Sequence, residues 1–137
     1  MKVSNLALCA GLTVLLAACG GSARLTTVED QRVFFNFDKY YIRPDAKQGL
    51  LAQAEFLRAN EDIRVLLAGH CDERGTREYN LALGMRRANS AKQVLVANGV
   101  AANRIELISY GKDNPWTPGT GERVWALNRN VHTTIIR

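Results

Sequence analysis

The sequence predicts an α/β or α+β domain with one mixed sheet and helices on one face of that sheet. Short segments with alternating or strongly apolar residues are typical of strands, and they alternate along the chain with two longer segments in which apolar residues recur every three or four positions, as in helices. The length of the chain also favours one domain. If the first 18 of the 137 residues are removed as a signal, 119 residues remain, which is enough for a modest hydrophobic core. No internal repeat or low-complexity tract interrupts this pattern.

The first half of the body is predicted to fold as a strand, a helix and a strand. Residues 32–38, "RVFFNFD", place apolar side chains at alternate positions, which is typical of a β-strand. A helix is predicted over residues 44–60, because Pro44 suits the first helical position and apolar residues then recur at helical spacing. Those apolar residues are Ala46, Leu50, Ala54 and Leu57. Residues 63–70, "IRVLLAGH", predict the second strand.

The second half continues the alternation and ends on a strand. A long helix is predicted over residues 77–98, with Gly99 as its C-terminal stop. Residues 104–111 alternate as a third strand, and the proline- and glycine-rich "DNPWTPGTGE" that follows predicts a loop. A short helix over residues 122–128 and a closing strand over residues 131–136 complete the domain.

The N-terminal segment has the pattern of a lipoprotein signal. Lys2 precedes an uncharged apolar run over residues 3–18, which is short for a transmembrane helix and typical of a secretory signal. The "LAAC" at its end resembles the lipobox of bacterial lipoproteins, which are cut before a cysteine that then carries the acyl chains. Here that cysteine is Cys19, and Gly20 after it implies sorting to the outer membrane. A buried N-terminal helix is the alternative interpretation.

The lipoprotein interpretation divides the chain into three parts. These are a signal peptide (1–18), a lipidated N-terminus with a short tether (19–31) and a binding domain (32–137). Loss of Lys2 with the signal lowers the formal net charge from +5 to +4. Charges of both signs are dispersed without a Lys/Arg run, so nucleic acid is not an expected partner. A mildly basic surface suits an acidic polymer or an anionic lipid surface, but only weakly.

The stretch over residues 69–88, "GHCDERGTREYNLALGMRRA", concentrates ionisable side chains on the second helix and the loop before it. At roughly 100° per residue, four apolar residues fall on one side of this helix and form its expected core stripe. They are Leu81, Met85, Ala88 and Leu95. Asn80 and Arg87 point nearly the same way and border the stripe, whereas Arg86 projects to the opposite side, into solvent.

Three polar side chains are therefore expected around one concavity. Asp72 lies in the loop before the helix, and Arg87 and Asn80 lie at the edge of its packed face. Such a set suits a zwitterion, because a carboxylate accepts from an ammonium and a guanidinium makes a two-pronged contact with a carboxylate. An Asp72–Arg87 salt bridge that only stabilises the loop is an equally weighted alternative from spacing alone.

The His-Cys-Asp triplet raises the question of catalysis. Cys9 leaves with the signal and Cys19 is capped by acylation, so Cys71 has no partner for an internal disulfide. It is a reactive thiol, an intermolecular partner or a small buried filler. Alternation along a strand sends His70 and Cys71 to opposite faces, which disfavours a thiol enzyme. We therefore expect Cys71 to be a filler and His70 to form a structural hydrogen bond.

Other catalytic classes find little support. Three consecutive residues rarely converge on one metal ion, and no second ligand cluster accompanies residues 70–72. Glycoside cleavage needs two well-placed carboxylates, but Asp72 and Glu73 are neighbours followed by Arg74. The sequence thus predicts a binding protein that is not an enzyme and needs no metal or cofactor.

Three segments carry a resemblance to a known family. "FNFDKYYIRPDA", "GHCDERGTREYNLALGMRRANSAKQVL" and "ISYGKDNP" resemble the OmpA-like C-terminal domain family, and within it the peptidoglycan-associated lipoproteins. The resemblance covers the chain from Val33 onward and implies an α+β fold, a β-α-β-α-β-β sandwich with a mixed four-stranded sheet. It also implies non-covalent binding of peptidoglycan through the diaminopimelate of the stem peptide. The residues that it assigns to this ligand are Asp72, Arg87, Asn80, Phe37, Asp38, Leu83 and Arg129.

The chain departs from the family pattern at several positions. Cys71 stands where Thr or Ala is common, and Tyr41 where Asp is frequent. The late "NRR" of the family reads Asn128-Arg129-Asn130 here, so its second arginine is missing. The resemblance further implies outer-membrane lipid as the anchor and a TolB-like protein as a second partner. A periplasmic protein–protein adaptor is thus the alternative function.

Overall fold

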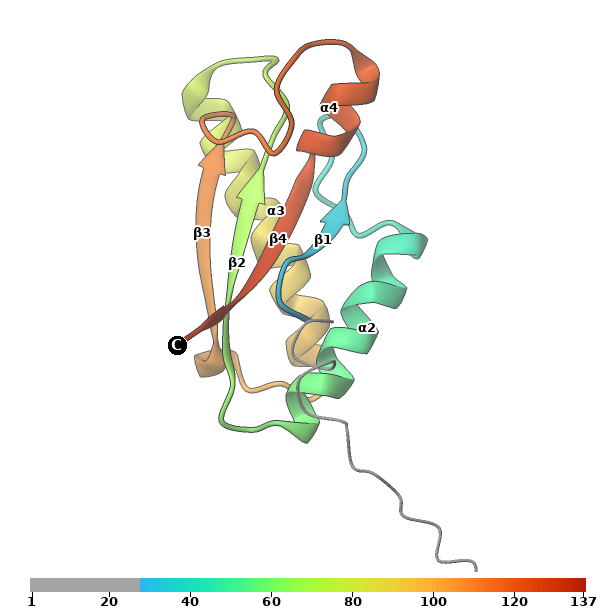
Figure 1. Ribbon diagram of the computed structural model, residues 1–137, viewed down its shortest axis with the longest axis vertical. Helices are drawn as coiled ribbons and strands as arrows, with labels where there is room; N and C mark the ends of the chain where they lie inside the picture. Colours follow the sequence, from blue (N-terminus) through green and yellow to red (C-terminus); the bar gives the residue numbers. More distant parts are fainter. Residues whose placement is uncertain (1–27) are drawn as a thin grey trace, which may run out of the picture.

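Four strands and three α-helices alternate along residues 31–137 of the computed structural model, which describes residues 28–137 (Figure 1). The strands are β1 (Gln31–Phe34), β2 (Arg64–His70), β3 (Ile105–Gly111) and β4 (Asn130–Ile136). The helices are α2 (Pro44–Ala59), α3 (Arg77–Ala97) and α4 (Glu122–Asn128), with a 3₁₀ turn at Ala102–Arg104. Every predicted strand and helix is present. The predicted signal, Cys19 and most of the tether lie outside the described residues.

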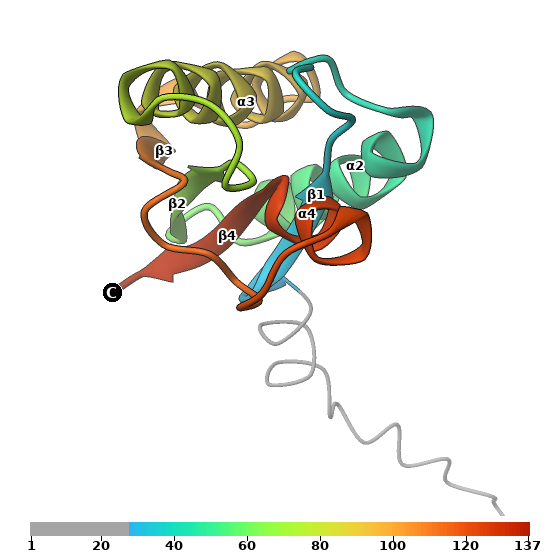
Figure 2. The same ribbon diagram turned by 90° about the horizontal axis from the view of Figure 1, so that it is seen from above.

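The strands form one mixed sheet in the order β1-β4-β2-β3. Strands β2 and β3 run parallel, while β4 lies between β1 and β2 and is antiparallel to both. Helices α2 and α3 cover the same face of this sheet, as the view from above shows (Figure 2). The predicted α+β class, with a mixed four-stranded sheet and helices on one face, is confirmed.

The hydrophobic core lies between these two helices and the sheet. The four apolar residues predicted to face inward from α2 are all buried, which confirms that helical pattern. They pack with residues of α3 and the central strands in one cluster, which includes Val65, Leu67, Ala88 and Leu95. Val28 also belongs to this cluster, so packing begins before β1. The long loops lie mainly at one end of the layers, where β2 stops and α3 starts (Figure 1).

The predicted inward face of α3 was wrong in part. Met85 is 40 % exposed and Leu81 only half-buried, so the core stripe does not run through them. The buried residues of α3 are Asn80, Leu83, Gly84, Arg87, Ala88, Ala91 and Leu95. Small residues dominate the middle of this face because α3 lies very close to β2. Asn80 and Arg87 therefore lie within the buried face instead of bordering it.

The first strand is shorter than predicted, ending at Phe34 instead of residue 38. The Phe35 N–H still donates to the Arg129 carbonyl (2.9 Å), but the chain then turns away from the sheet. The Lys39 N–H donates to the Asn36 carbonyl, and Asp38 adopts a left-handed φ of 56°. The "NFD" end of the strand pattern therefore forms a loop.

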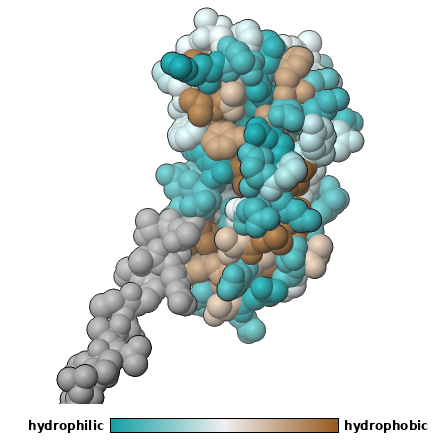
Figure 3. Space-filling model, turned by 90° about the vertical axis from the view of Figure 1, so that its right-hand side faces the viewer, coloured by the Kyte–Doolittle hydropathy of each residue, from teal (hydrophilic) through white to brown (hydrophobic). Residues whose placement is uncertain are grey.

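The outer surface seen from the α2 side is mostly hydrophilic, with apolar side chains scattered among polar ones (Figure 3). Within residues 28–137, no helix is long and apolar enough to cross a bilayer.

Two glycines set the distance between α3 and β2. A Cβ on Gly69 would lie 1.8 Å from the Gly84 carbonyl oxygen, and one on Gly84 would lie 3.0 Å from the Gly69 carbonyl oxygen. The obstacles to a Cβ on Gly69 are backbone atoms of Gly84, which cannot move without displacing the helix, and a Cβ on Gly84 would also lie 2.3 Å from Ser109 Oγ. This contact holds the N-terminal half of α3 against the end of β2.

Replacing Gly69 by alanine should lower the free energy of unfolding by about 2–3 kcal/mol, because α3 must move away from the sheet. The matched control is Gly49→Ala in α2, where a Cβ would meet only Val33 Cγ1 at 3.8 Å. This second change should raise the free energy of unfolding by about 0.5–1 kcal/mol through better helix propensity. Urea unfolding of both variants measures this, and shifts of the same sign would contradict it.

Candidate functional site

A pocket of about 280 Å³ opens at the end of the sheet where β2 meets α3. Its walls are the loop after β1, the loop after β2 and the first turns of α3. Six of the seven predicted ligand-binding residues line it, namely Phe37, Asp38, Asp72, Asn80, Leu83 and Arg87. The seventh, Arg129, lies behind the pocket against Asp72. The structure thus brings the predicted residues together from segments far apart in the chain.

Arg87 projects from α3 into the protein and is only 1 % exposed. Its Nε–H donates to the Lys39 carbonyl (2.8 Å), Nη1 to the His70 carbonyl (3.0 Å) and Nη2 to the Asn36 carbonyl (3.1 Å). Burial lowers the pKa of this guanidinium below its usual value. Because arginine has five N–H donors, these three bonds leave one N–H on each η nitrogen without a partner among residues 28–137.

Asp72 is also buried, at 4 % exposure, but its partners are not those that spacing suggested. Oδ1 accepts from the backbone N–H and Nε of Arg74, and Oδ2 accepts from Arg74 Nη2 (2.9 Å) and Arg129 Nη1 (3.4 Å). Within residues 28–137, no salt bridge joins Asp72 to Arg87. Burial acts to raise the pKa of Asp72, but the hydrogen bonds and charge of Arg74, with Arg129, outweigh it and lower the pKa.

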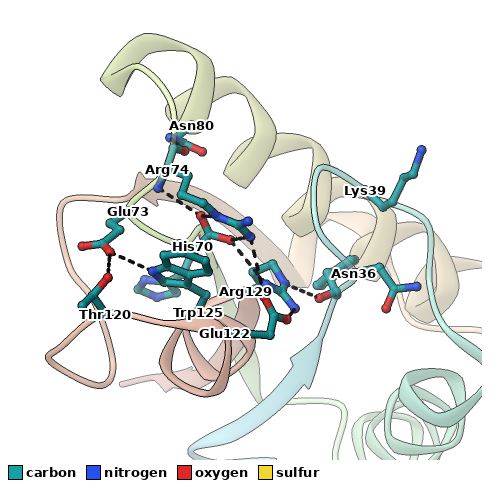
Figure 4. Close-up of polar contacts among 12 residues, drawn as sticks. Asn36, Lys39, His70, Glu73, Arg74, Asn80, Thr120, Glu122, Trp125 and Arg129 are labelled. Carbon is teal, nitrogen blue, oxygen red and sulfur yellow. Dashed lines mark hydrogen bonds and ion pairs between the residues drawn. The ribbon is translucent and has the colours of Figure 1, made fainter.

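Arg129 connects the carboxylate to the rest of the fold. Its Nε–H donates to the Phe35 carbonyl (2.9 Å) and its Nη2 to Glu122 Oε1 (2.9 Å), so the guanidinium is held on three sides. Figure 4 shows Arg74 above Arg129, with Glu122 beneath Arg129. Although the second arginine of the family pattern is missing, the first one lies at the site.

Asn80 shapes the loop before α3. Both of its amide N–H groups are used, since Nδ2 donates to the Arg74 carbonyl (2.8 Å) and to the Thr76 carbonyl (3.0 Å). Thr76 in turn caps α3 by accepting from the Tyr79 N–H (3.1 Å). Only the Asn80 amide oxygen therefore remains for a ligand.

The rim of the pocket contains side chains that sequence reasoning missed. The guanidinium of Arg74 lies over two rings, 3.8 Å from the centroid of Phe37 and 4.1 Å from that of Trp125. The Tyr79 hydroxyl donates to the Asp38 carboxylate. The sequence position of Arg74 could have predicted this contact, because an arginine two residues after an aspartate in a tight loop can fold back onto the carboxylate.

The expectations for His70 and Cys71 hold. The Cys71 thiol is buried, donates to the Asn80 carbonyl (3.3 Å), and has its pKa raised by burial to about 11. It is therefore protonated at neutral pH and is no nucleophile. His70 Nδ1 donates to the Asn114 carbonyl (3.0 Å), and burial lowers the pKa of this imidazole to about 4. No metal-binding group of three His, Cys, Asp or Glu side chains occurs in the described residues.

Known proteins share both the sequence and the fold. The model of the OmpA family matches residues 34–129. The peptidoglycan-associated lipoprotein of Mesorhizobium japonicum is 44 % identical over 135 residues, which cover 98 % of this chain and 80 % of that protein. The protein of the same name from Pasteurella multocida is 41 % identical, covering 95 % of this chain and 96 % of its own length.

Solved structures agree with these relatives. The crystal structure of the peptidoglycan-associated lipoprotein from Burkholderia pseudomallei superposes with a TM-score of 0.75 and 36 % identity, covering 77 % of this chain and 90 % of that chain. The C-terminal domain of Helicobacter pylori MotB superposes with a TM-score of 0.72 at 21 % identity, covering 78 % of this chain and 84 % of that one. The second similarity concerns the fold alone.

The two neighbouring arginines of α3 should behave differently when each is replaced by alanine. Arg87→Ala removes three donors from backbone carbonyls and should lower the free energy of unfolding by about 2–4 kcal/mol. Arg86→Ala, on the exposed face, should change it by no more than about 0.5 kcal/mol. Urea unfolding of the two variants gives the comparison, and equal midpoints would show that the carbonyl bonds of Arg87 do not stabilise the fold.

Proposed function

The chain belongs to the OmpA family, and we propose that it is a lipoprotein that attaches the outer membrane to the cell wall by binding peptidoglycan non-covalently. The curated relatives that it matches over most of their length are named peptidoglycan-associated lipoproteins, which supports this proposal. OmpA-like domains bind and do not catalyse, in agreement with the prediction that the chain is not an enzyme. The proposed role includes envelope integrity and cell division.

The observation that carries the proposal is a pair of buried, oppositely charged side chains that share one small pocket without pairing with each other. Asp72 and Arg87 are 4 % and 1 % exposed, and both line the pocket. Burial disfavours the charge of Arg87, whose hydrogen-bond partners among residues 28–137 are neutral carbonyls. The arginine partners of Asp72, in contrast, outweigh the effect of its burial. A ligand with a cationic and an anionic end would complement both groups.

The free end of diaminopimelate in the stem peptide is such a ligand, because its ammonium and carboxylate sit on one carbon. In the proposed complex the carboxylate binds the two remaining N–H groups of Arg87, and Asp72 accepts from the ammonium. Leu83 and Phe37 line the same pocket and contact the methylene chain. The Asn80 amide oxygen adds an acceptor for the ammonium.

Attachment does not require a tight single contact. Fourteen residues from Cys19 to Val33 span at most about 50 Å when extended, so a lipid-anchored domain stays close to the wall. Peptidoglycan repeats its stem peptides, and tethering beside repeated sites raises the effective concentration to about millimolar. Weak individual sites therefore suffice for a lasting attachment.

A second candidate function is an adaptor for a TolB-like protein. The observation that favours it is a group of aromatic side chains, each about half exposed, on and beside the pocket rim. They are Phe37, Tyr40, Tyr41 and Tyr79. Aromatic residues are enriched in the cores of protein interfaces. Parallel pull-downs with purified sacculi and with a TolB-like protein separate the two functions.

The binding mode predicts discrimination among stem peptides. Amidation of the free diaminopimelate carboxylate keeps its size but replaces an acceptor with an NH₂ donor, which faces donors only on Arg87. Losing this charge-assisted bond, worth about 1.5–3 kcal/mol, should weaken binding about tenfold or more. Replacing diaminopimelate by lysine should do the same. Calorimetry with the three muropeptides tests this, and equal affinities would show that Arg87 does not bind this carboxylate.

The anchor is tested separately through Cys19. Changing Cys19→Ser removes the thiol that the acyl chain requires, so the variant should accumulate as an unprocessed precursor or as a soluble protein. Membrane fractionation and gel mobility give the readout, with Cys71→Ser as a control that keeps the lipobox intact. Normal size and outer-membrane fractionation of the Cys19→Ser variant would refute lipid anchoring.

A further inference from the structure

The side chain of Arg74 occupies the position on Asp72 that the proposed ligand needs. Its Nε–H donates to Oδ1 (3.2 Å) and its Nη2 donates to Oδ2 (2.9 Å), so it contacts both oxygens of the carboxylate. A carboxylate offers about four acceptor positions. The other two are filled by the Arg74 backbone N–H at Oδ1 and by Arg129 Nη1 at Oδ2. No acceptor position is left for an ammonium ion.

The two arginines on Asp72 are not equally fixed. The Arg129 side chain is 7 % exposed, and it also binds the Phe35 carbonyl and Glu122. The Arg74 side chain is 32 % exposed and belongs to the loop before α3. Within residues 28–137, the contacts of its guanidinium other than Asp72 are the faces of Phe37 and Trp125 and, at 3.9 Å, Glu122. Arg74 is therefore the partner that can leave.

Departure of the Arg74 side chain would leave the carboxylate in place. The Arg74 backbone N–H and Arg129 would still hold one position on each oxygen, and two adjacent positions would face the pocket. The released guanidinium has an alternative partner in Glu122, whose side chain is 67 % exposed. Figure 4 shows Arg74 above Trp125, with Glu122 below Arg129.

We propose that Arg74 is an internal competitor for Asp72, which the ammonium of the ligand displaces on binding. This inference rests on the proposed function and adds a specificity-determining residue to it. A ligand gains access to Asp72 only if it supplies a cation that replaces the guanidinium. Because binding selects the displaced state, the apparent affinity is lowered by the fraction of molecules in that state. Neutral or acylated amines cannot make the exchange.

The test compares Arg74→Met with Arg77→Met in calorimetric titrations with a diaminopimelate muropeptide. Methionine keeps an unbranched side chain between the two rings but has no donors. Arg77 loses the same charge three residues later, where its side chain is 72 % exposed and pairs with Asp113 outside the pocket. Arg74→Met should bind about fivefold to tenfold more tightly than the parent, whereas Arg77→Met should bind like the parent.

A second measurement uses the parent protein and does not depend on how a variant folds. The Arg74 Nε–H should exchange slowly with solvent in the free protein, because it donates to Asp72. Saturation with the muropeptide should make its NMR signal exchange rapidly, and the same muropeptide with its free amine acetylated should not. A signal that stays protected at saturation would overturn the inference.

The outcomes separate this inference from the proposed function. Equal or weaker binding by a folded Arg74→Met variant, with the parent still binding, overturns the competitor role and leaves peptidoglycan binding intact. The competitor role would also be overturned if Arg74→Met gained as much affinity for the acetylated muropeptide as for the muropeptide with a free amine. The acetylated form has no ammonium that could take the position vacated by Arg74. Failure of the parent to bind any diaminopimelate muropeptide overturns the proposed function, and the inference with it.

Discussion

The Arg87 guanidinium is the interaction on which the geometry of the site depends. From the middle of α3 it binds two carbonyls of the loop after β1 and one carbonyl at the end of β2. Because β1 ends at Phe34, no backbone hydrogen-bond ladder connects the loop after β1 to β2. The side chain of Arg87 connects them instead. The close glycine contact between Gly69 and Gly84 brings α3 near enough for a side chain to do this.

Arg129 repeats the arrangement behind the pocket, where it donates to the Phe35 carbonyl, to Asp72 and to Glu122. Two buried cations thus hold one loop by its backbone, and a single buried carboxylate compensates part of their charge. The thiol and imidazole at the end of β2 are both held neutral by burial at pH 7. Fixed charges that do not exchange protons near neutral pH suit recognition of a charged ligand better than acid–base catalysis.

Periodicity was sufficient to predict the elements, because strands and helices differ in how often an apolar side chain recurs. It predicted α2 and its buried residues, and it placed Asp72 and Arg87 around one concavity, where the resemblance to a known family also placed them. It failed where packing is set by backbone contact: Met85 is exposed because α3 meets the sheet through Gly84. It also extended β1 too far, since hydrogen bonds from arginine side chains to carbonyls leave no periodic trace. The role of Arg74 was not predicted either, because it depends on the conformation of the loop before α3, which periodicity does not reveal.

The occupied state of Asp72 has a consequence for how the proposed attachment works. A site whose carboxylate already has a cation binds more weakly than an empty one, because each ligand must replace an existing ion pair. For a lipid-anchored domain beside a repeating polymer, weak binding is an advantage, since the domain releases one stem peptide and captures the next while effective concentration keeps it at the wall. The same exchange restricts capture to ligands with a free ammonium. In the proposed mechanism, therefore, Arg74 links modest affinity to selectivity.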